Sequence, residues 1–251
     1  MLEPAPDVMP PPVVEPPAVL PIERAAAAFE VILCSGFPTQ IVIITLLSTF
    51  GMKVHLPDGG LSPSFVFALA SLDTILVVGL VALFMRSHHE SMREHLFGRD
   101  IGRREILLGL LLVPLSFLVV LTVRLIVQLV MPSLRNVPHN PLQDLVRSRI
   151  DAVIFALVVM IAGGVREEIQ RGFVLRRFEQ YLGGGVVGLV MFSALFGLGH
   201  LEQGNDIALA TAVLGAFWGA IFLARRSIVG PMIGHAGFNL VQVMIFLMMA
   251  G

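Results

Sequence analysis

The sequence GGVREEIQRGF, residues 163–173, places two adjacent carboxylates, Glu167 and Glu168, at the end of an apolar run from Ala152 to Val165. Such a run is typical of a membrane-embedded helix, where ionisable residues usually face a bundle interior or a water-filled cavity and mark a functional site. On a helix, Arg171 lies four residues after Glu167 and three after Glu168, so it can pair with either carboxylate. A structural ion pair at a helix end, or the cytoplasmic flank of a span, is the alternative interpretation.

The composition of the chain is that of an integral membrane protein. Of its 251 residues, 56% are hydrophobic and only 14% are charged, and the mean hydropathy is +0.86, far from the values of a soluble domain. A net charge of -1 argues against a nucleic-acid partner. The single cysteine, Cys34, excludes an internal disulfide framework and a cysteine-based zinc cluster. The lipid bilayer is therefore the partner that composition predicts.

Apolar segments long enough to cross a bilayer predict an all-α fold, a polytopic integral membrane helical bundle over residues 25–251. A Pro-rich, acidic tail at residues 1–24, which we expect to be disordered, precedes it. Seven transmembrane helices are predicted, or eight if residues 25–54 or 173–200 contain a further short element. The fourth can begin as early as Pro141. The predicted spans are 31–52, 64–85, 106–131, 151–171, 186–200, 207–224 and 228–249.

Arginine sets the predicted orientation. The longest basic loop runs from Arg86 to Arg104, and two arginine pairs fall in loops that would share its side, at residues 176–177 and 225–226. Cytoplasmic loops of membrane proteins are rich in basic residues. We therefore predict a multi-pass protein of a bacterial inner (cytoplasmic) membrane with its N-terminus in the cytoplasm.

Two histidines lie inside predicted spans, whereas the other five lie in loops. Phe196 is four residues before His200, so the two rings share a helix face, and Asn239 is four residues after His235. A lone intramembrane histidine is usually a hydrogen-bonded packing residue, but two on separate helices downstream of paired carboxylates favour a site. Glycines beside these positions would let the helices approach closely. They are Gly163, Gly164, Gly172, Gly197, Gly199, Gly234 and Gly237.

Two other charged residues lie inside predicted spans. Asp73 and Arg124 occupy the second and third spans, and each needs a partner in lipid. We predict that they form a structural pair with each other.

These residue types fit acyl hydrolysis without a covalent nucleophile. A carboxylate can deprotonate water, a histidine can orient that water, and histidine and asparagine donors can stabilise an oxyanion. His200, His235 and Glu167 could also hold a divalent metal such as zinc, although no cofactor is required. The His-Glu-x-x-His zinc motif and the Gly-x-Ser-x-Gly elbow of serine hydrolases are both absent from the sequence.

The three segments resemble the CAAX protease and bacteriocin-processing (CPBP, or Abi) family of intramembrane endopeptidases. The pattern of that family is Glu-Glu-x-x-x-Arg, then Phe-x-x-x-His, then His-x-x-x-Asn, each on a separate membrane helix. Here Glu167-Glu168 with Arg171, Phe196 with His200, and His235 with Asn239 follow in that order within residues 150–245. One residue fewer separates Glu168 from Arg171 than in the family pattern, so we expect a shifted arginine pairing.

The resemblance implies an intramembrane peptidase that cleaves a membrane-associated protein or peptide at a cytosol-facing cavity. Glu167 and His200 would activate water, and His235 and Asn239 would form the oxyanion hole. We predict that Glu168 and Arg171 fix the end of the helix. Because bacterial members of the family have other or unknown substrates, prenyl specificity is not carried over.

Residue counts from the arginine-marked ends place Glu167 and His235 at similar depth, with His200 nearer the outer face. A short interfacial helix at 173–182 would reconcile the three positions. Two non-hydrolytic functions remain as alternatives. One is a transporter or proton relay, against which the lack of internal repeats argues. The other is a scaffold or immunity protein of the same fold that has lost activity, as the shortened motif would allow.

Overall fold

The computed structural model describes residues 19–98 and 101–250, and that part of the chain is helical without any strand. The predicted all-α membrane bundle is confirmed. Most of the predicted Pro-rich tail, residues 1–18, lies outside the described residues, but helix α1 already begins at Pro21 inside the range assigned to the tail.

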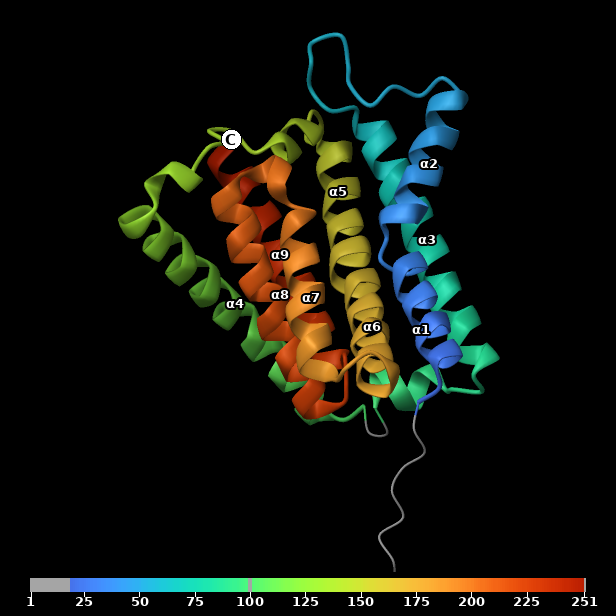
Figure 1. The fold of residues 1–251 in the computed structure, drawn as a ribbon. Helices are drawn as coiled ribbons and strands as arrows, with labels where there is room; N and C mark the ends of the chain where they lie inside the picture. The colour runs from blue at the N-terminus through green and yellow to red at the C-terminus, as the bar shows by residue number, and fades with distance from the viewer. Residues whose placement is uncertain (1–18, 99–100, 251) are drawn as a thin grey trace, which may run out of the picture.

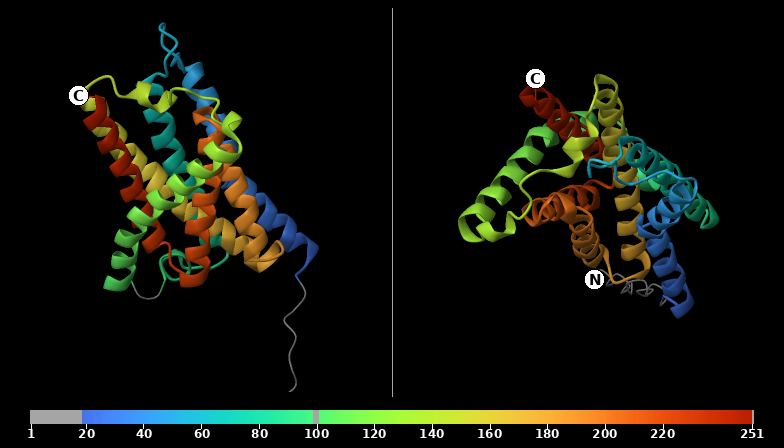
Figure 2. Two further views of the ribbon diagram at one scale, coloured as in Figure 1. Left: turned by 90° about the vertical axis from the view of Figure 1, so that its left-hand side faces the viewer. Right: turned by 90° about the horizontal axis from the view of Figure 1, so that it is seen from above.

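The α5–η4–α6 path runs between two groups of helices, α1–α3 on one side and α4 with α7–α9 on the other (Figures 1 and 2). A π-helix, η4, joins α5 to α6 without a break. Short helical segments lie between the longer elements: η1 (Arg93–Phe97), η2 (Pro132–Leu134), η3 (Pro141–Leu145) and η5 (Leu201–Gln203). The principal helices are α1 (Pro21–Leu33), α2 (Phe37–Thr49), α3 (Pro63–Ser87), α4 (Arg103–Val130), α5 (Arg149–Val158), η4 (Val159–Arg166), α6 (Glu167–Tyr181), α7 (Gly185–Leu198), α8 (Asn205–Arg225) and α9 (Val229–Ala250).

Four described helices, α3, α4, α8 and α9, are long and apolar enough to cross a membrane, and α1 with α2, bent by 42°, can form a fifth span. This count is below the seven to eight predicted. The difference has two physical causes: α7 is apolar but only 14 residues long, and α6 carries too much charge to qualify by composition. Both nevertheless run alongside the longer helices (Figure 1).

Two expectations about the fourth span were wrong. It does not begin near Pro141, because the turn η3 (Pro141–Leu145) is separate and α5 starts at Arg149. The Ser148 side chain caps α5 by accepting a hydrogen bond from the Asp151 amide at 3.1 Å, which satisfies an otherwise free N–H group. There is also no separate interfacial helix at 173–182, since α6 continues to Tyr181 and ends in a glycine turn.

The three arginine groups lie at the same end of the bundle, where α3, α6 and α8 end (Figure 1). They are tied together there by acidic partners. Nε of Arg177 donates to Glu30 of α1 at 2.6 Å, and its Nη1 donates to Glu90 at 2.8 Å. At the same end, Arg225 pairs with Glu105 of α4. The predicted sharing of one side is therefore confirmed, while its cytoplasmic identity stays a prediction.

Glu90 lies in the loop after α3 and links that loop to α6. Burial alone would raise the pKa of Glu90, but hydrogen bonds from Gln180 and Arg177 outweigh it and hold the pKa below its ordinary value. A lowered carboxylate pKa stabilises the fold fully above the ordinary glutamate pKa. This contribution is lost as the pH falls through the lowered value.

The predicted pair between Asp73 and Arg124 is wrong. Asp73 pairs with Arg166 of η4, and Nε of Arg124 lies 3.4 Å from Oδ2 of Asp206 in α8. The reason is the order of the helices in space, because α3 packs on η4 and α6 whereas α4 packs on α8 and α9. Each buried carboxylate is thus paired with the cation of the helix that it contacts.

The contact between η4 and α9 requires glycine at position 164. A Cβ atom there would lie 2.5 Å from Cβ and 2.7 Å from Cα of Ala236, too close for any side chain. We expect Gly164→Ala to lower the free energy of unfolding by about 1–3 kcal/mol, the usual cost of overpacking. Thermal unfolding in detergent measures it. The matched control is Gly79→Ala in α3, where nothing lies within 4 Å, and a Gly164→Ala protein as stable as this control would contradict the packing described.

Candidate active site

The π-helix η4 carries the chain directly into the two glutamates. In its eight residues, Val159–Arg166, the backbone hydrogen bonds span five residues instead of the four of an α-helix. Such π-helical turns occur often at functional sites. One consequence is visible at Val159, whose carbonyl oxygen accepts a hydrogen bond at 3.0 Å from Nδ2 of Asn239 in α9. The amide of Asn239 lies against Gly163, where a Cβ atom would collide with it. The π-helix therefore holds Asn239 close to the start of α6.

Glu168 is the most buried charged group of the site, with 0% of its side-chain surface exposed. Its Oε1 is contacted by Nη1 of Arg171 and accepts a hydrogen bond at 2.8 Å from Nδ1 of His235. The Arg171 contact spans three residues of one helix, as the sequence spacing allows, and the His235 contact joins α6 to α9. One oxygen of Glu168 thus receives both a cation and a histidine donor, while its Oε2 has no partner among the described residues.

Arg171 is enclosed by aromatic rings. Its guanidinium carbon lies 4.9 Å from the ring centroid of Phe196, 5.4 Å from that of Phe192 and 5.6 Å from that of Trp218. A cation over an aromatic face is attracted by the ring quadrupole, and more strongly where water is excluded. Arg171 is 1% exposed, and its environment consists of these rings and the Glu168 carboxylate.

His235 lies between the two glutamates. With Nδ1 on Glu168, its Nε2 lies 3.7 Å from Oε2 of Glu167. The ring stacks on Trp218, with centroids 3.9 Å apart and planes inclined by 22°. An ionised carboxylate can only accept hydrogen bonds, so Nδ1 of His235 must carry the hydrogen that it donates to Glu168. The orientation of the ring is therefore fixed by a hydrogen bond on one side and a stacked indole on its face.

Glu167 differs from its neighbour in being accessible. One-fifth of its side-chain surface is exposed (20%), and its two charged neighbours stand at 3.7 and 3.9 Å, beyond hydrogen-bond distance. Successive residues on a helix point about 100° apart, so one glutamate can turn into the bundle while the other does not. Glu167 is therefore the more exposed and less tightly bound of the two carboxylates.

His200 lies beyond Phe196 from this cluster. Its ring meets the Phe196 ring edge-on with centroids 5.0 Å apart, and Phe196 meets His235 in the same way at 6.2 Å. Nδ1 of His200 donates to the Phe196 carbonyl at 2.8 Å, so Nε2 is its remaining polar atom. Among the described residues, His200 makes no hydrogen bond or ion pair with either glutamate. The structure therefore gathers Glu167, Glu168, Arg171, Phe196, His235 and Asn239, and leaves His200 at the edge of the group.

Three neighbours of the site were missed from the sequence: Trp218, Arg166 and Asp73. Trp218 is the only tryptophan of the chain and lies in an apolar span, which reads as ordinary packing. Arg166 precedes Glu167 directly, and Asp73 is the sole carboxylate of α3. The need of Asp73 for a cation was recognised, but sequence spacing could not identify the cation.

The site does not fit a metal ion. Within residues 19–98 and 101–250, no three His, Cys, Asp or Glu side chains are grouped closely enough to hold one. Metal binding by His200, His235 and Glu167 therefore stays a prediction from the sequence.

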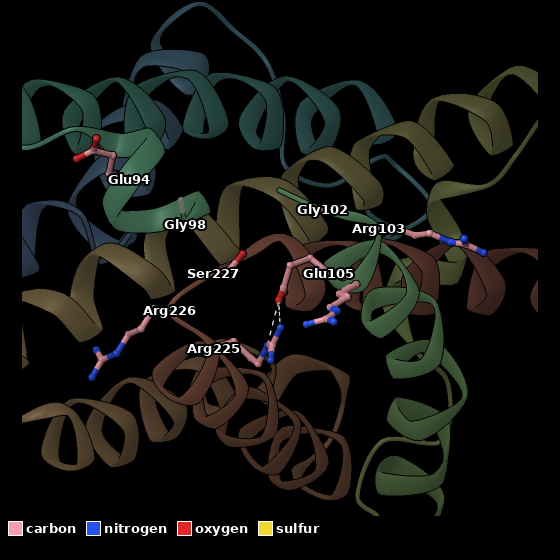
Figure 3. A pocket seen from close by; sticks show the side chains of 9 residues that line it. Glu94, Gly98, Gly102, Arg103, Glu105, Arg225, Arg226 and Ser227 are labelled. Carbon is pink, nitrogen blue, oxygen red and sulfur yellow. Dashed lines mark hydrogen bonds and ion pairs between the residues drawn. The ribbon is translucent and has the colours of Figure 1, made fainter. Parts of the chain in front are cut away.

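Two cavities of the bundle are not lined by any motif residue. One of 630 Å³ opens at the arginine-rich end between η1, α4 and the α8–α9 turn, and Figure 3 shows Glu105 and Arg225 paired within it. The other, of 340 Å³, is an apolar groove between α3 and the α5–η4 path. Neither contains the glutamates, so the implied cytosol-facing cavity remains an expectation.

Comparison with known families matches residues 149–241 to the model described as "Type II CAAX prenyl endopeptidase Rce1-like". The matched segment begins at α5 and ends in α9, so it includes all three motifs. No curated protein and no solved structure matches the chain. The resemblance to the CAAX protease family is confirmed over this segment.

The two glutamates should respond differently to the same substitution. We expect Glu168→Gln to lower the free energy of unfolding by about 3–5 kcal/mol, because it leaves the buried Arg171 without its counter-charge. Glu167→Gln, the matched control one residue away, should unfold close to the parent. Thermal and chemical unfolding in detergent measure both. Equal stability of the two variants would contradict the division of roles seen in the structure.

Proposed function

We propose that this chain is a CAAX-type intramembrane protease, and that it hydrolyses a peptide bond of a membrane-associated protein or peptide by water that Glu167 activates. The observation that carries the proposal is the contrast between the adjacent carboxylates. Glu168 is buried and bound by Arg171 and His235, whereas Glu167 is accessible and lies beside the same histidine ring. A general base must be able to reach water, and of the two glutamates only Glu167 has exposed side-chain surface.

In the proposed reaction, Glu167 accepts a proton from water while the water oxygen bonds to the carbonyl carbon of the substrate. The carbonyl π-electrons move to the oxygen, which becomes an oxyanion. Collapse of this tetrahedral intermediate breaks the C–N bond, and the proton held by Glu167 passes to the leaving nitrogen. Atoms and charge balance without a covalent intermediate and without a metal.

The oxyanion needs donors, and α9 supplies two candidates. The Asn239 amide uses one N–H on Val159 and keeps a second for the substrate. His235 can donate from Nε2 only when its ring carries both hydrogens, since Nδ1–H is committed to Glu168.

His200, in contrast to the two donors of α9, can accept a hydrogen bond. Because Nδ1–H donates to the Phe196 carbonyl, the neutral ring presents Nε2 as an acceptor. We assign it the role of orienting the attacking water from the far side of Phe196. Catalytic contacts are often long before substrate binds and tighten in the complex, so the present separation is compatible with that role.

Purified protein in detergent or vesicles should cleave a fluorogenic peptide that carries an apolar anchor. Glu167→Gln, His200→Ala and His235→Ala should abolish turnover, and Asn239→Ala should reduce kcat by about 10²–10³-fold, the usual effect of one lost oxyanion donor. The control is His55→Ala, which changes an exposed histidine in a loop. Full activity of the four site variants would favour the transporter or scaffold function.

We propose that the arginine-rich end faces the cytoplasm. This orientation follows the basic-residue rule and places the loop after α3 inside and the loop after α4 outside. Cys34 is fully buried, so single cysteines can be introduced without removing it. A membrane-impermeant maleimide added to intact cells should label Ser133→Cys and spare Ser91→Cys, both exposed positions. The opposite pattern would invert the topology.

A further inference from the structure

Asp73 is a buried carboxylate in the middle of the apolar helix α3, and it is 4% exposed. Its partners come from two other elements. Nη2 of Arg166 contacts Oδ2, and Oγ1 of Thr39 donates to Oδ1 at 2.5 Å. Nε2 of Gln40 lies 3.4 Å from Oδ2. A carboxylate in lipid surroundings is costly unless it is paired, so this cluster is specified rather than incidental.

The same guanidinium faces the proposed base. Nη1 of Arg166 lies 3.9 Å from Oε1 of Glu167, while its Nη2 is in contact with Asp73. Arg166 is itself buried, at 7% exposure. The Arg166 guanidinium therefore lies between two carboxylates. It is in contact with Asp73 but is 3.9 Å from Glu167.

The break between α1 and α2 is shaped around this guanidinium. Gly36 there has a φ of +88°, a conformation that favours glycine, and a Cβ atom would lie 2.6 Å from Nη2 of Arg166. One turn further along α6, Nε2 of Gln170 donates to the Cys34 carbonyl at 2.7 Å. The position of Arg166 is thus fixed from α1–α2 as well as from α3.

We propose that Asp73 is a positioning residue for Glu167. By binding Nη2 of Arg166, it keeps the guanidinium from closing onto the Glu167 carboxylate, which stays open to water while a positive charge remains beside it. The inference rests on the proposed function in treating Glu167 as the base. Without Asp73, Arg166 has one remaining carboxylate within reach and would form a direct ion pair with it.

Two readouts test the inference. The first is labelling of Glu167 by a hydrophobic carbodiimide, followed by peptide mass spectrometry. This reagent attacks protonated carboxyls, so capture by Arg166 slows it. Labelling should fall in Asp73→Asn and rise in Arg166→Gln. The second readout is peptide cleavage, where Asp73→Asn should lower kcat by about 10²-fold, the cost of a misplaced catalytic group, with little change in KM.

The double variant separates positioning from plain structural support. In Asp73→Asn with Arg166→Gln, no guanidinium remains to capture Glu167, so both labelling and kcat should recover relative to Asp73→Asn alone. The matched control is Glu105→Gln, which removes a carboxylate of similar burial (5%) in the first turn of α4, where it pairs with Arg225. It should lose stability while kcat and Glu167 labelling stay at parental values.

The inference is overturned if Asp73→Asn behaves like Glu105→Gln in both readouts at a temperature where both are folded. It is also overturned if Glu167 takes no label in either the parent or Arg166→Gln. Labelling does not depend on turnover. Cleavage by Glu167→Gln would therefore overturn the proposed function, while the labelling result would still decide whether Asp73 keeps Arg166 away from Glu167.

Discussion

The hydrogen bond between His235 and Glu168 is the interaction on which the candidate site depends. It joins α6 to α9 at a carboxylate with no exposed side-chain surface, and Arg171 meets the same oxygen from within α6. A buried charge that loses its partner destabilises a protein strongly. The aromatic rings from α7 and α8 surround this ion pair and exclude water from it. Four helices therefore meet at one buried ion pair.

This arrangement explains how two adjacent glutamates can have different roles. The helical rotation between neighbours turns Glu168 into the bundle and leaves Glu167 partly exposed. Because Glu168 is bound by both Arg171 and His235, Glu167 lies on a firmly held helix, as its proposed catalytic role would require. The π-helix η4, which precedes Glu167, also holds this part of the chain in place because it packs directly against α9.

Much of the fold could be predicted from the sequence because lipid imposes length and hydropathy on every span. The ends of α3, α4, α8 and α9 lie within a few residues of the predicted segments. The contact between Glu168 and Arg171 could also be predicted, since the two residues are three apart on one helix. These features are local, and local rules are sufficient for them.

What could not be predicted depends on which helices are neighbours. Asp73 was assigned to Arg124, yet α3 contacts η4, so Arg166 is its partner. The continuation of α6 to Tyr181 was missed because its charged turns do not resemble a span. The position of His200 beyond Phe196 depends on how α7 packs against α8. The sequence pattern of α7 does not indicate this packing.

A double-mutant cycle on the free energy of unfolding, with Glu168→Gln, His235→Gln and the double variant, tests the central claim most directly. If the hydrogen bond between these side chains joins α6 to α9, the two substitutions should be coupled by on the order of 1 kcal/mol or more, as contacting residues are. Additive effects within about 0.5 kcal/mol, the behaviour of distant and independent sites, would contradict it.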